Sequence, residues 1–273
     1  QMLFRPLRQI ADKFNTLQMG MVAANRVFKI IDTSSKIPNK GKLSADSLKG
    51  NIDFKNIEFF YNEGEDVLKN ISFNVKSGEK VAIVGATGSG KTTIVNLLTR
   101  FYDSQKGTIK LDKMDIKNID IFSLRSKISI VLQDVFLFAD SLLNNITLWN
   151  KSISFDNVIS AAKKIGIHDF ILSLPNGYNY NVKERGVMLS QGQRQLISFL
   201  RAYLKKPSIL ILDEATSSID SNSEELIQNA ILKITENKTS IIIAHRLSTI
   251  LNSDRILVMD KGLLVESGSH KEL

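Results

Sequence analysis

Apolar side chains recur along residues 1–33 at spacings that alternate between four and three. They fall at Leu3, Leu7, Ile10, Phe14, Leu17, Met21, Ala24, Phe28 and Ile31. This heptad spacing predicts one long helix with a single apolar seam, roughly 45 Å long at ~1.5 Å per residue. Such a helix either packs on its own domain or reaches toward a partner, and its length favours the partner.

The pattern changes after this helix. Residues 34–50 contain turn-forming residues and no regular apolar spacing, which predicts a linker. These residues are Ser34, Ser35, Pro38, Asn39, Gly41 and Gly50. From Ile52 onward, short β-rich runs alternate with amphipathic helical stretches, which indicates that a folded domain occupies residues 51–273.

Four short apolar runs organise this domain. They are Val81–Val84, Ser129–Leu132, Ile209–Leu212 and Ser240–Ala244. Each run is continuous rather than alternating, as expected for a strand that is buried on both faces of a parallel sheet. Because helical stretches separate the runs, the sequence predicts an α/β fold with a parallel central sheet.

Polar residues follow all four runs. The first run leads into a glycine-rich loop at Gly85, the second into Gln133, the third into Asp213 and Glu214, and the fourth into His245. Ligands of open α/β sheets bind outside the carboxyl ends of the strands, so this edge is the expected site. A lone histidine is more often a satisfied core residue, but the place of His245 after a buried strand favours the site.

The glycine-rich loop has the pattern G-x-x-x-x-G-K-[ST] between a strand and a helix, as a phosphate-binding loop requires. Its residues are Gly85, Ala86, Thr87, Gly88, Ser89, Gly90, Lys91 and Thr92. The glycines let backbone N–H groups turn toward phosphate oxygens, and the helix adds the positive end of its dipole. Lys91 supplies a positive charge to the β- and γ-phosphates. The alternative, a glycine-rich turn that contains a lysine by chance, is disfavoured by the strand before the loop and the helix after it.

Magnesium chemistry fits the same edge. The Thr92 hydroxyl is a suitable Mg²⁺ ligand, and a carboxylate is needed on the other side of the ion. Asp213 ends a buried strand, where a carboxylate is expensive unless it binds something. Glu214 directly follows it, so one carboxylate can hold the metal through water while the other polarises an attacking water.

Composition and charge exclude several classes of protein. The 273 residues include no cysteine, which rules out disulfides, cysteine-ligated zinc, iron–sulfur clusters and thiol catalysis. Residues 1–50 hold nine Lys/Arg and three Asp/Glu, so most of the net charge of +8 lies there. A basic segment of this kind fits nucleic acid, an anionic membrane surface or simply a solvated helix face.

The apolar runs and the start of the chain add three expectations. No run of eighteen apolar residues is present, so the sequence predicts no complete membrane span, and the first residues do not resemble a signal peptide. Because the chain begins at Gln1, we expect it to be a fragment of a longer protein.

Further motifs appear in a fixed order around the phosphate loop. Tyr61 precedes it by about two dozen residues, and Leu189-Ser190-Gln191-Gly192-Gln193 lies between Gln133 and Asp213. Ser217-Ser218-Ile219-Asp220 follows Glu214. Over residues 51–273 this set resembles the nucleotide-binding domain of an ATP-binding-cassette (ABC) transporter: Walker A, Q-loop, signature, Walker B, D-loop and switch histidine.

The resemblance implies a P-loop NTPase cassette with a parallel core sheet, an antiparallel β subdomain and a helical signature subdomain at about 134–205. Catalytic roles are then implied for Glu214, His245, Gln133 and Lys91, and metal binding for Thr92, Gln133 and Asp213. The residues implied to bind ATP are Tyr61, which would stack on adenine, Gly85, Ala86, Thr87, Gly88, Ser89, Gly90, Lys91, Thr92, Thr93, Ser190, Gln191, Gly192, Gln193 and Asp220.

The signature also has a local physical rationale. Ser190 is a good N-cap for a helix expected over Gln193–Lys205, and a helix N-terminus is a second anion site. In the resembled family, the signature of one cassette covers the γ-phosphate on the Walker A loop of another. The resemblance therefore implies a head-to-tail pair with an identical or paralogous cassette. Gln191 departs from the usual glycine of the signature, and Ile219 from the usual leucine of the D-loop.

Two features resemble exporters within this family. Glu184-Arg185-Gly186 resembles the X-loop beside the coupling helices, and residues 1–33 resemble the cytoplasmic end of the last transmembrane helix. This implies a transmembrane domain as partner, a location at the cytoplasmic face of the cell membrane, and an ATPase that powers export of an unidentified substrate. Coupling helices would press on Phe136–Ile146, where Phe136, Leu137 and Phe138 are expected to be exposed, or buried as ordinary core residues.

The alternative is a soluble ABC-type ATPase that acts on nucleic acid or ribosomes. Only 56 positions separate Gln133 from Leu189, which leaves no room for a long coiled coil, and the near-neutral cassette lacks a basic stripe for nucleic acid. A regulatory cassette without catalysis is disfavoured by Glu214. A separate importer subunit is disfavoured by the fused N-terminal helix.

Overall fold

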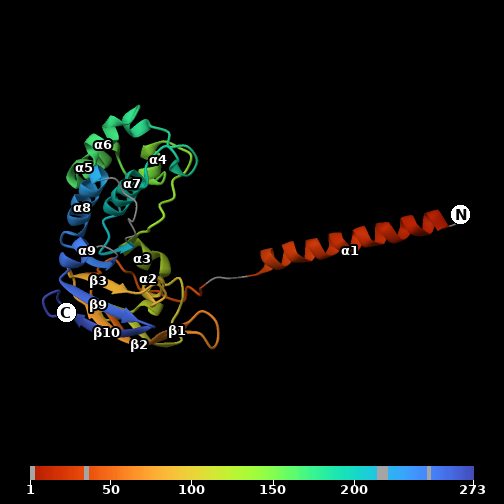
Figure 1. Cartoon of the computed structure of the whole chain (residues 1–273), viewed down its shortest axis with the longest axis horizontal. Helices are drawn as coiled ribbons and strands as arrows, with labels where there is room; N and C mark the ends of the chain where they lie inside the picture. Colours follow the sequence, from red (N-terminus) through yellow and green to blue (C-terminus); the bar gives the residue numbers. More distant parts are fainter. Residues whose placement is uncertain (1–3, 34–36, 214–220, 245–246) are drawn as a thin grey trace. The chain divides into compact units, whose positions relative to one another are not determined.

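A computed structural model gives the architecture of the chain (Figure 1). The described residues are 4–33, 37–213, 221–244 and 247–273. The chain divides into two compact units, Gln1–Pro38 and Asn39–Leu273.

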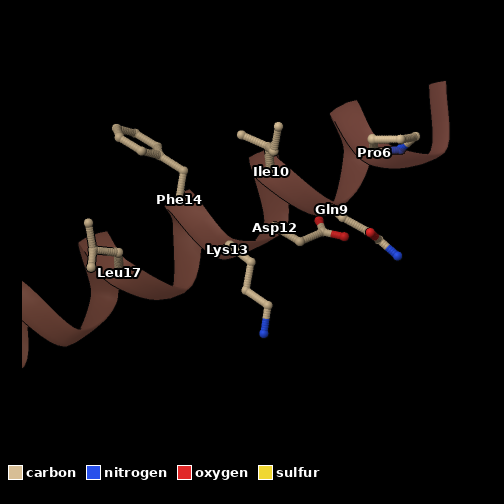
Figure 2. Close-up of a pocket in the computed structure, with 7 residues that line it drawn as sticks. All are labelled: Pro6, Gln9, Ile10, Asp12, Lys13, Phe14 and Leu17. Carbon is tan, nitrogen blue, oxygen red and sulfur yellow. The ribbon is translucent and has the colours of Figure 1, made fainter. Parts of the chain in front are cut away.

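The first unit is the predicted long helix. Helix α1 spans Phe4–Asp32, and all of its residues are exposed. Ile10 and Phe14 project from one side of the helix while Asp12 and Lys13 project from the other (Figure 2), so the apolar seam is a real face of the helix. None of the helices among the described residues combines the length and the apolar character needed to cross a bilayer.

The centre of the second unit is a six-stranded sheet. In spatial order its strands are β10 (Leu263–Gly268), β9 (Arg255–Asp260), β3 (Lys80–Gly85), β8 (Thr239–Ile243), β7 (Ile209–Asp213) and β6 (Ile128–Val131). All neighbours pair in parallel except β10 with β9. The four predicted strands are confirmed, and β8 explains their continuous apolar character. Ile241 and Ile243 face one hydrophobic core while Ile242 faces the other.

A four-stranded antiparallel sheet covers one face of the parallel sheet. Its order is β2 (Asp66–Val75), β1 (Ile52–Phe60), β4 (Lys106–Leu111) and β5 (Met114–Asp115). Phe54 of β1 stacks on Phe73 of β2 with ring centroids 4.6 Å apart. Both rings belong to the core that also contains Ile241 and Ile243, so this sheet forms the antiparallel subdomain.

Helices complete the unit. They are α2 (Lys91–Leu98), α3 (Ile121–Lys127), α4 (Leu142–Thr147), α5 (Phe155–Ile165), α6 (His168–Ser173), α7 (Gln191–Leu204), α8 (Ser221–Thr235) and α9 (Leu247–Leu251), with short 3₁₀ turns at Ile116–Asn118, Gly177–Asn179 and Glu184–Gly186. Helices α4 to α7 gather at one end of the unit and the antiparallel sheet at the other (Figure 1), which confirms a helical signature subdomain.

Two local expectations are corrected here. Helix α7 begins at Gln191 rather than at Gln193, because Ser190 is the N-cap and the residue after an N-cap is already helical. The residues expected to form a linker also become ordered earlier than composition indicates. Residues from Asn39 belong to the compact unit, where Ala45 and Leu48 are buried in the core.

Candidate nucleotide site

The phosphate loop joins the end of β3 to the start of α2. Gly85 has φ +153°, and a Cβ at this position would lie 2.1 Å from the carbonyl oxygen of Met259, so only glycine fits. Gly90 precedes α2 at φ +101°, and no side chain caps the helix. The first N–H groups of α2 are therefore left for an anion, at the positive end of the helix dipole.

Lys91 lies within this loop. Its side chain is buried, and Nζ donates hydrogen bonds to the carbonyl oxygens of Gly85 (2.8 Å) and Ala86 (2.9 Å). Burial lowers the pKa of Lys91, while the charge of Asp213 acts in the opposite direction. The ammonium group therefore already lies at the loop that would hold the phosphates. The hydroxyl of Ser89 is also buried there without a hydrogen-bond partner among the described residues, so the loop has donors to offer an incoming anion.

An aromatic side chain stands beside the loop helix. The hydroxyl groups of Tyr61 and Thr93 lie within hydrogen-bond distance (3.2 Å), and Asn96 Nδ2 donates to the Tyr61 hydroxyl at 3.1 Å. The Tyr61 ring packs edge-on against Phe59 and Tyr102, with centroids 4.9 and 5.0 Å away. Yet 45% of Tyr61 remains exposed, so the ring is fixed in place with surface left for a planar ligand.

Asn96 and Tyr102 are the residues of this corner that sequence reasoning misses. Nothing in the local pattern distinguishes Asn96 from any other polar residue on α2. Its importance arises only from the tertiary contact with Tyr61.

Replacement of Tyr61 by alanine is expected to weaken nucleotide binding, because base–aromatic stacking contributes about 1–3 kcal/mol per base. Tyr61→Phe keeps the ring and loses only the hydroxyl, so it is the matched control and should bind nearly as well as the parent chain. Titration with a fluorescent ATP analogue measures both affinities. An unchanged dissociation constant in Tyr61→Ala would remove this ring from the site.

The carboxyl ends of the parallel strands meet at the same edge, as the sequence predicts. Asp213 ends β7 and is in register with Ile243 of β8, which is itself in register with Ile83 of β3. Gln133 follows β6 and is exposed to solvent. Asp213 also interacts electrostatically with Lys91, which brings the predicted metal ligand and the loop lysine together.

Several predicted residues cannot be placed. Glu214, His245 and Asp220 lie outside the described residues, as do Ser217, Ser218 and Ile219. Their roles stay predictions from the sequence.

The signature forms the N-terminus of α7. Ser190 Oγ accepts a hydrogen bond from the Gln193 N–H (3.2 Å), and Gln193 Oε1 accepts one from the Ser190 N–H (3.0 Å), which is a capping box. Gln191 and Gly192 occupy the first two helical positions, whose N–H groups have no partner within the helix. The Ser190 hydroxyl accepts the cap bond, so its own proton remains available for an external anion.

Gln191 lines a cavity together with the residue expected in the Q-loop. A cavity of about 610 Å³ is lined by Gln133, Asp134, Val135, Phe136, Arg185, Val187, Gln191 and Arg194. The fold thus brings the Q-loop glutamine beside the unusual signature residue. Neither Ser190 nor Gly192 hydrogen-bonds to the phosphate loop within the described part of the chain.

The segment after Gln133 presents an aromatic surface. Phe136 is 56% exposed and Phe138 43%, as expected for a docking surface, whereas Leu137 is fully buried, as the alternative of an ordinary core residue predicts. Leu137 packs in the helical core with Leu142, because a non-helical segment that crosses a core must turn some side chains inward. Trp149 adds to the surface, with its ring centroid 4.9 Å from that of Phe138.

These features define a P-loop nucleotide-binding domain of the α/β class: a parallel sheet, a glycine loop at the end of β3 and an uncapped helix after it. Comparison with known families gives the particular one. Residues 68–217 match the family model described as ABC transporter, which covers more than half of the chain. The chain therefore belongs to the ABC transporter family.

Relatives extend the match along the whole chain. The chain is 44% identical over 271 residues to a probable multidrug resistance ABC transporter ATP-binding/permease protein of Bacillus subtilis, covering 99% of this chain and 40% of that protein. It is 44% identical over 269 residues to an ATP-dependent lipid A-core flippase of Saccharophagus degradans, covering 98% of this chain and 46% of the relative. The chain thus spans less than half the length of these relatives.

A solved structure is similar throughout. It is a bacterial Atm1-family ABC exporter with ATP bound, 41% identical in sequence, with a TM-score of 0.82 over 99% of this chain and 47% of that chain. This likeness agrees with the cassette fold and its N-terminal helix.

Proposed function

We propose that this chain is the ATP-binding and ATP-hydrolysing domain of an ABC exporter and that it powers export of an unidentified substrate. The observation that carries the proposal is the arrangement of Lys91, the uncapped start of α2 and the fixed, open-faced Tyr61 around one corner. That corner offers phosphate contacts and a stacking surface together. The names of the relatives support the exporter class.

The residues divide the work on ATP. Loop N–H groups and Lys91 bind the β- and γ-phosphates, which places the γ-phosphate at the carboxyl edge of the sheet. Thr92, Gln133 and Asp213 supply a hydroxyl, an amide oxygen and a carboxylate, a donor set that suits Mg²⁺. When bound, the ion neutralises charge on the phosphate oxygens. Glu214 polarises the attacking water as the general base, and His245 orients the substrate and this base.

The signature completes the site of a second chain. Ser190 Oγ–H and the N–H groups of Gln191 and Gly192 can donate to a γ-phosphate, yet within the described residues none of them hydrogen-bonds to the phosphate loop of their own chain. A head-to-tail pair with an identical or paralogous cassette brings each signature to the partner's loop. Donors aimed at the transferring phosphoryl group then stabilise the charge that develops on it.

The transmembrane domain of the same transporter is the other partner. Phe136, Phe138 and Trp149 expose aromatic surface next to the Q-loop, as a site for coupling helices requires. The basic excess of residues 1–50 fits a position near the anionic inner leaflet, so the domain belongs at the cytoplasmic face of the membrane. ATP favours the paired state and thereby shifts the membrane part between its two accesses.

A complementation assay tests the composite site. Lys91→Met removes the lysine from one phosphate loop, whereas Ser190→Asp keeps an N-cap but sets a carboxylate against the γ-phosphate. Each variant alone is expected to lose ATP hydrolysis. A mixture is expected to regain part of it, because one site of the mixed pair combines an intact loop with an intact signature.

The matched control is Ser154→Asp, at the N-cap of α5, where Ser154 Oγ accepts from the Asn157 N–H in the same way. It should hydrolyse ATP like the parent chain. Two inactive variants whose mixture also stays inactive would contradict the head-to-tail arrangement. Failure of the parent chain to bind Mg–ATP would contradict the proposed function itself.

A further inference from the structure

Helix α7 and its C-cap residue Lys205 carry three cations that donate to backbone carbonyl groups outside the helix. Arg194 donates to the carbonyl oxygen of Leu189 (2.7 Å), the first residue of the signature. Lys205, at the far end, donates to the carbonyl oxygens of Arg125 (2.7 Å) and Ile128 (2.8 Å), where β6 begins. Arg201 lies between them and serves neither the phosphate loop nor the signature. Its contacts define a connection that the ATP site does not require.

Arg201 holds the aromatic segment by its backbone. Its guanidinium donates to the carbonyl oxygens of Asn145 and Phe136, and to Asn145 Oδ1 at 3.0 Å. No carboxylate pairs with it within the described residues, and burial lowers the pKa of Arg201 to about 10. Half-burying a guanidinium that has only neutral acceptors costs free energy, so the three hydrogen bonds of Arg201 are not an incidental surface contact.

Asn145 connects Arg201 to the aromatic surface through hydrogen bonds. Its side chain is fully buried and bonds both backbone groups of Phe138: Oδ1 accepts from the N–H (2.8 Å) and Nδ2 donates to the carbonyl oxygen (3.0 Å). The Phe138 ring in turn contacts Trp149. An unbroken chain of contacts therefore runs from α7 through Arg201 and Asn145 to the two exposed rings.

We propose that Arg201 is a positioning residue that ties the aromatic surface of Phe136, Phe138 and Trp149 to the signature helix α7, so that the two move as one body. A displacement of the Ser190 end of α7 then appears at the aromatic surface of the same chain, along a path that bypasses Gln133. The second half of this inference rests on the proposed function, since pairing over ATP is what displaces that end.

Trp149 is the only tryptophan of the chain, so its fluorescence reports this surface directly. The first arm of the experiment needs no nucleotide. Arg201→Met has similar length without donors, and it is expected to shift the emission of Trp149 to longer wavelength and to increase its quenching by acrylamide. Arg201→Lys keeps the charge but loses the planar guanidinium. The emission and quenching of Trp149 in this variant should lie between those of the parent chain and those of Arg201→Met.

The matched control is Lys163→Met, which removes an exposed cation from α5 in the same helical subdomain. Lys163→Met should leave the emission and the acrylamide quenching of Trp149 as they are in the parent chain. Circular dichroism verifies that each variant is folded, and Arg201→Lys decides the question should Arg201→Met fail to fold. Unaltered emission and quenching in the folded Arg201 variants would overturn the tie.

The second arm adds Mg–ATP to chains that also carry Glu214→Gln, with solution mass recording the pairing. We expect the emission of Trp149 to change on pairing when Arg201 is present. With Arg201→Met, pairing and the affinity for a fluorescent ATP analogue should persist while this change is lost. A pair that forms without any change at Trp149, or a change that survives without Arg201, would overturn the transmission.

The two failures are distinguishable. Absence of ATP binding in the parent chain would reject the proposed function, and the nucleotide-free arm would still decide whether Arg201 ties the surface to α7.

Discussion

Lys91→Met is expected to abolish measurable ATP hydrolysis and to weaken nucleotide binding by at least about tenfold. A hydrogen bond to a charged group contributes about 1.5–3 kcal/mol, and each 1.4 kcal/mol is a factor of ten in affinity. Nζ already lies at the mouth of the loop, on the carbonyl oxygens of Gly85 and Ala86, so the ammonium needs only a short movement to reach phosphate. Titration with a fluorescent ATP analogue and a phosphate-release assay measure the two losses.

Lys91→Met is not expected to lower the stability of the fold, although it lowers both binding and hydrolysis. Burial lowers the pKa of Lys91, which means that the folded protein disfavours the charged form relative to the unfolded chain. Methionine removes that penalty and fills the same space, so thermal unfolding should occur at the parent temperature or above it. A residue that opposes folding yet carries a ligand contact is typical of a functional site.

Two controls sharpen this result. Lys76→Met removes an exposed lysine after β2 and should change neither binding nor hydrolysis. Lys91→Arg keeps the charge but places it on a wider, planar guanidinium, which is not equivalent to the compact ammonium. Parental affinity in Lys91→Met would exclude the loop as the phosphate site.

The loop and the sheet edge could be predicted because their signals are local. Gly85 needs a conformation and a space that only glycine satisfies, and the residues around it specify strand, turn and helix in sequence. The buried runs are equally local, since a strand covered on both faces must be apolar at every position. These constraints act within a dozen residues, where a pattern can be recognised.

The features that sequence reasoning missed depend on contacts between distant segments. Asn96 positions Tyr61 across 35 residues, and Arg201 holds Asn145 across 56. For Leu137 the sequence left exposure and burial both open, and the core of the helical subdomain determines that it turns inward. No periodicity within one segment contains this information, because each contact is set by how separate elements pack.

Ordering of the predicted linker has the same origin. Residues around Gly41 contain the expected turn formers, but the N–H groups of Lys42 and Leu43 both bond to the carbonyl oxygen of Asn118. A Cβ on Gly41 would lie 2.1 Å from the carbonyl oxygen of Ile119, so the glycine permits a close approach rather than flexibility. Composition identifies a glycine, and tertiary structure decides its use.

Glu214→Gln is expected to lower steady-state turnover by about 10²- to 10⁴-fold, the usual contribution of a positioned general base. Glutamine keeps the size and shape of the side chain, but its neutral amide cannot accept the proton of the attacking water. Affinity for ATP should therefore survive, because Lys91, the loop N–H groups and Tyr61 are untouched. Phosphate release and the fluorescent analogue separate the two quantities.

Under the proposed pairing, the same variant should hold two chains together over Mg–ATP, because it still binds ATP and hydrolyses it far more slowly. Solution mass is then expected to double on addition of Mg–ATP and to stay single without nucleotide. Glu225→Gln, at an exposed position on α8, is the matched control and should turn over ATP at the parental rate. Full turnover in Glu214→Gln would exclude Glu214 as the base. A chain that binds ATP but stays single would contradict pairing of identical copies and favour a paralogous cassette, or pairing that requires the transmembrane domain to raise the effective concentration.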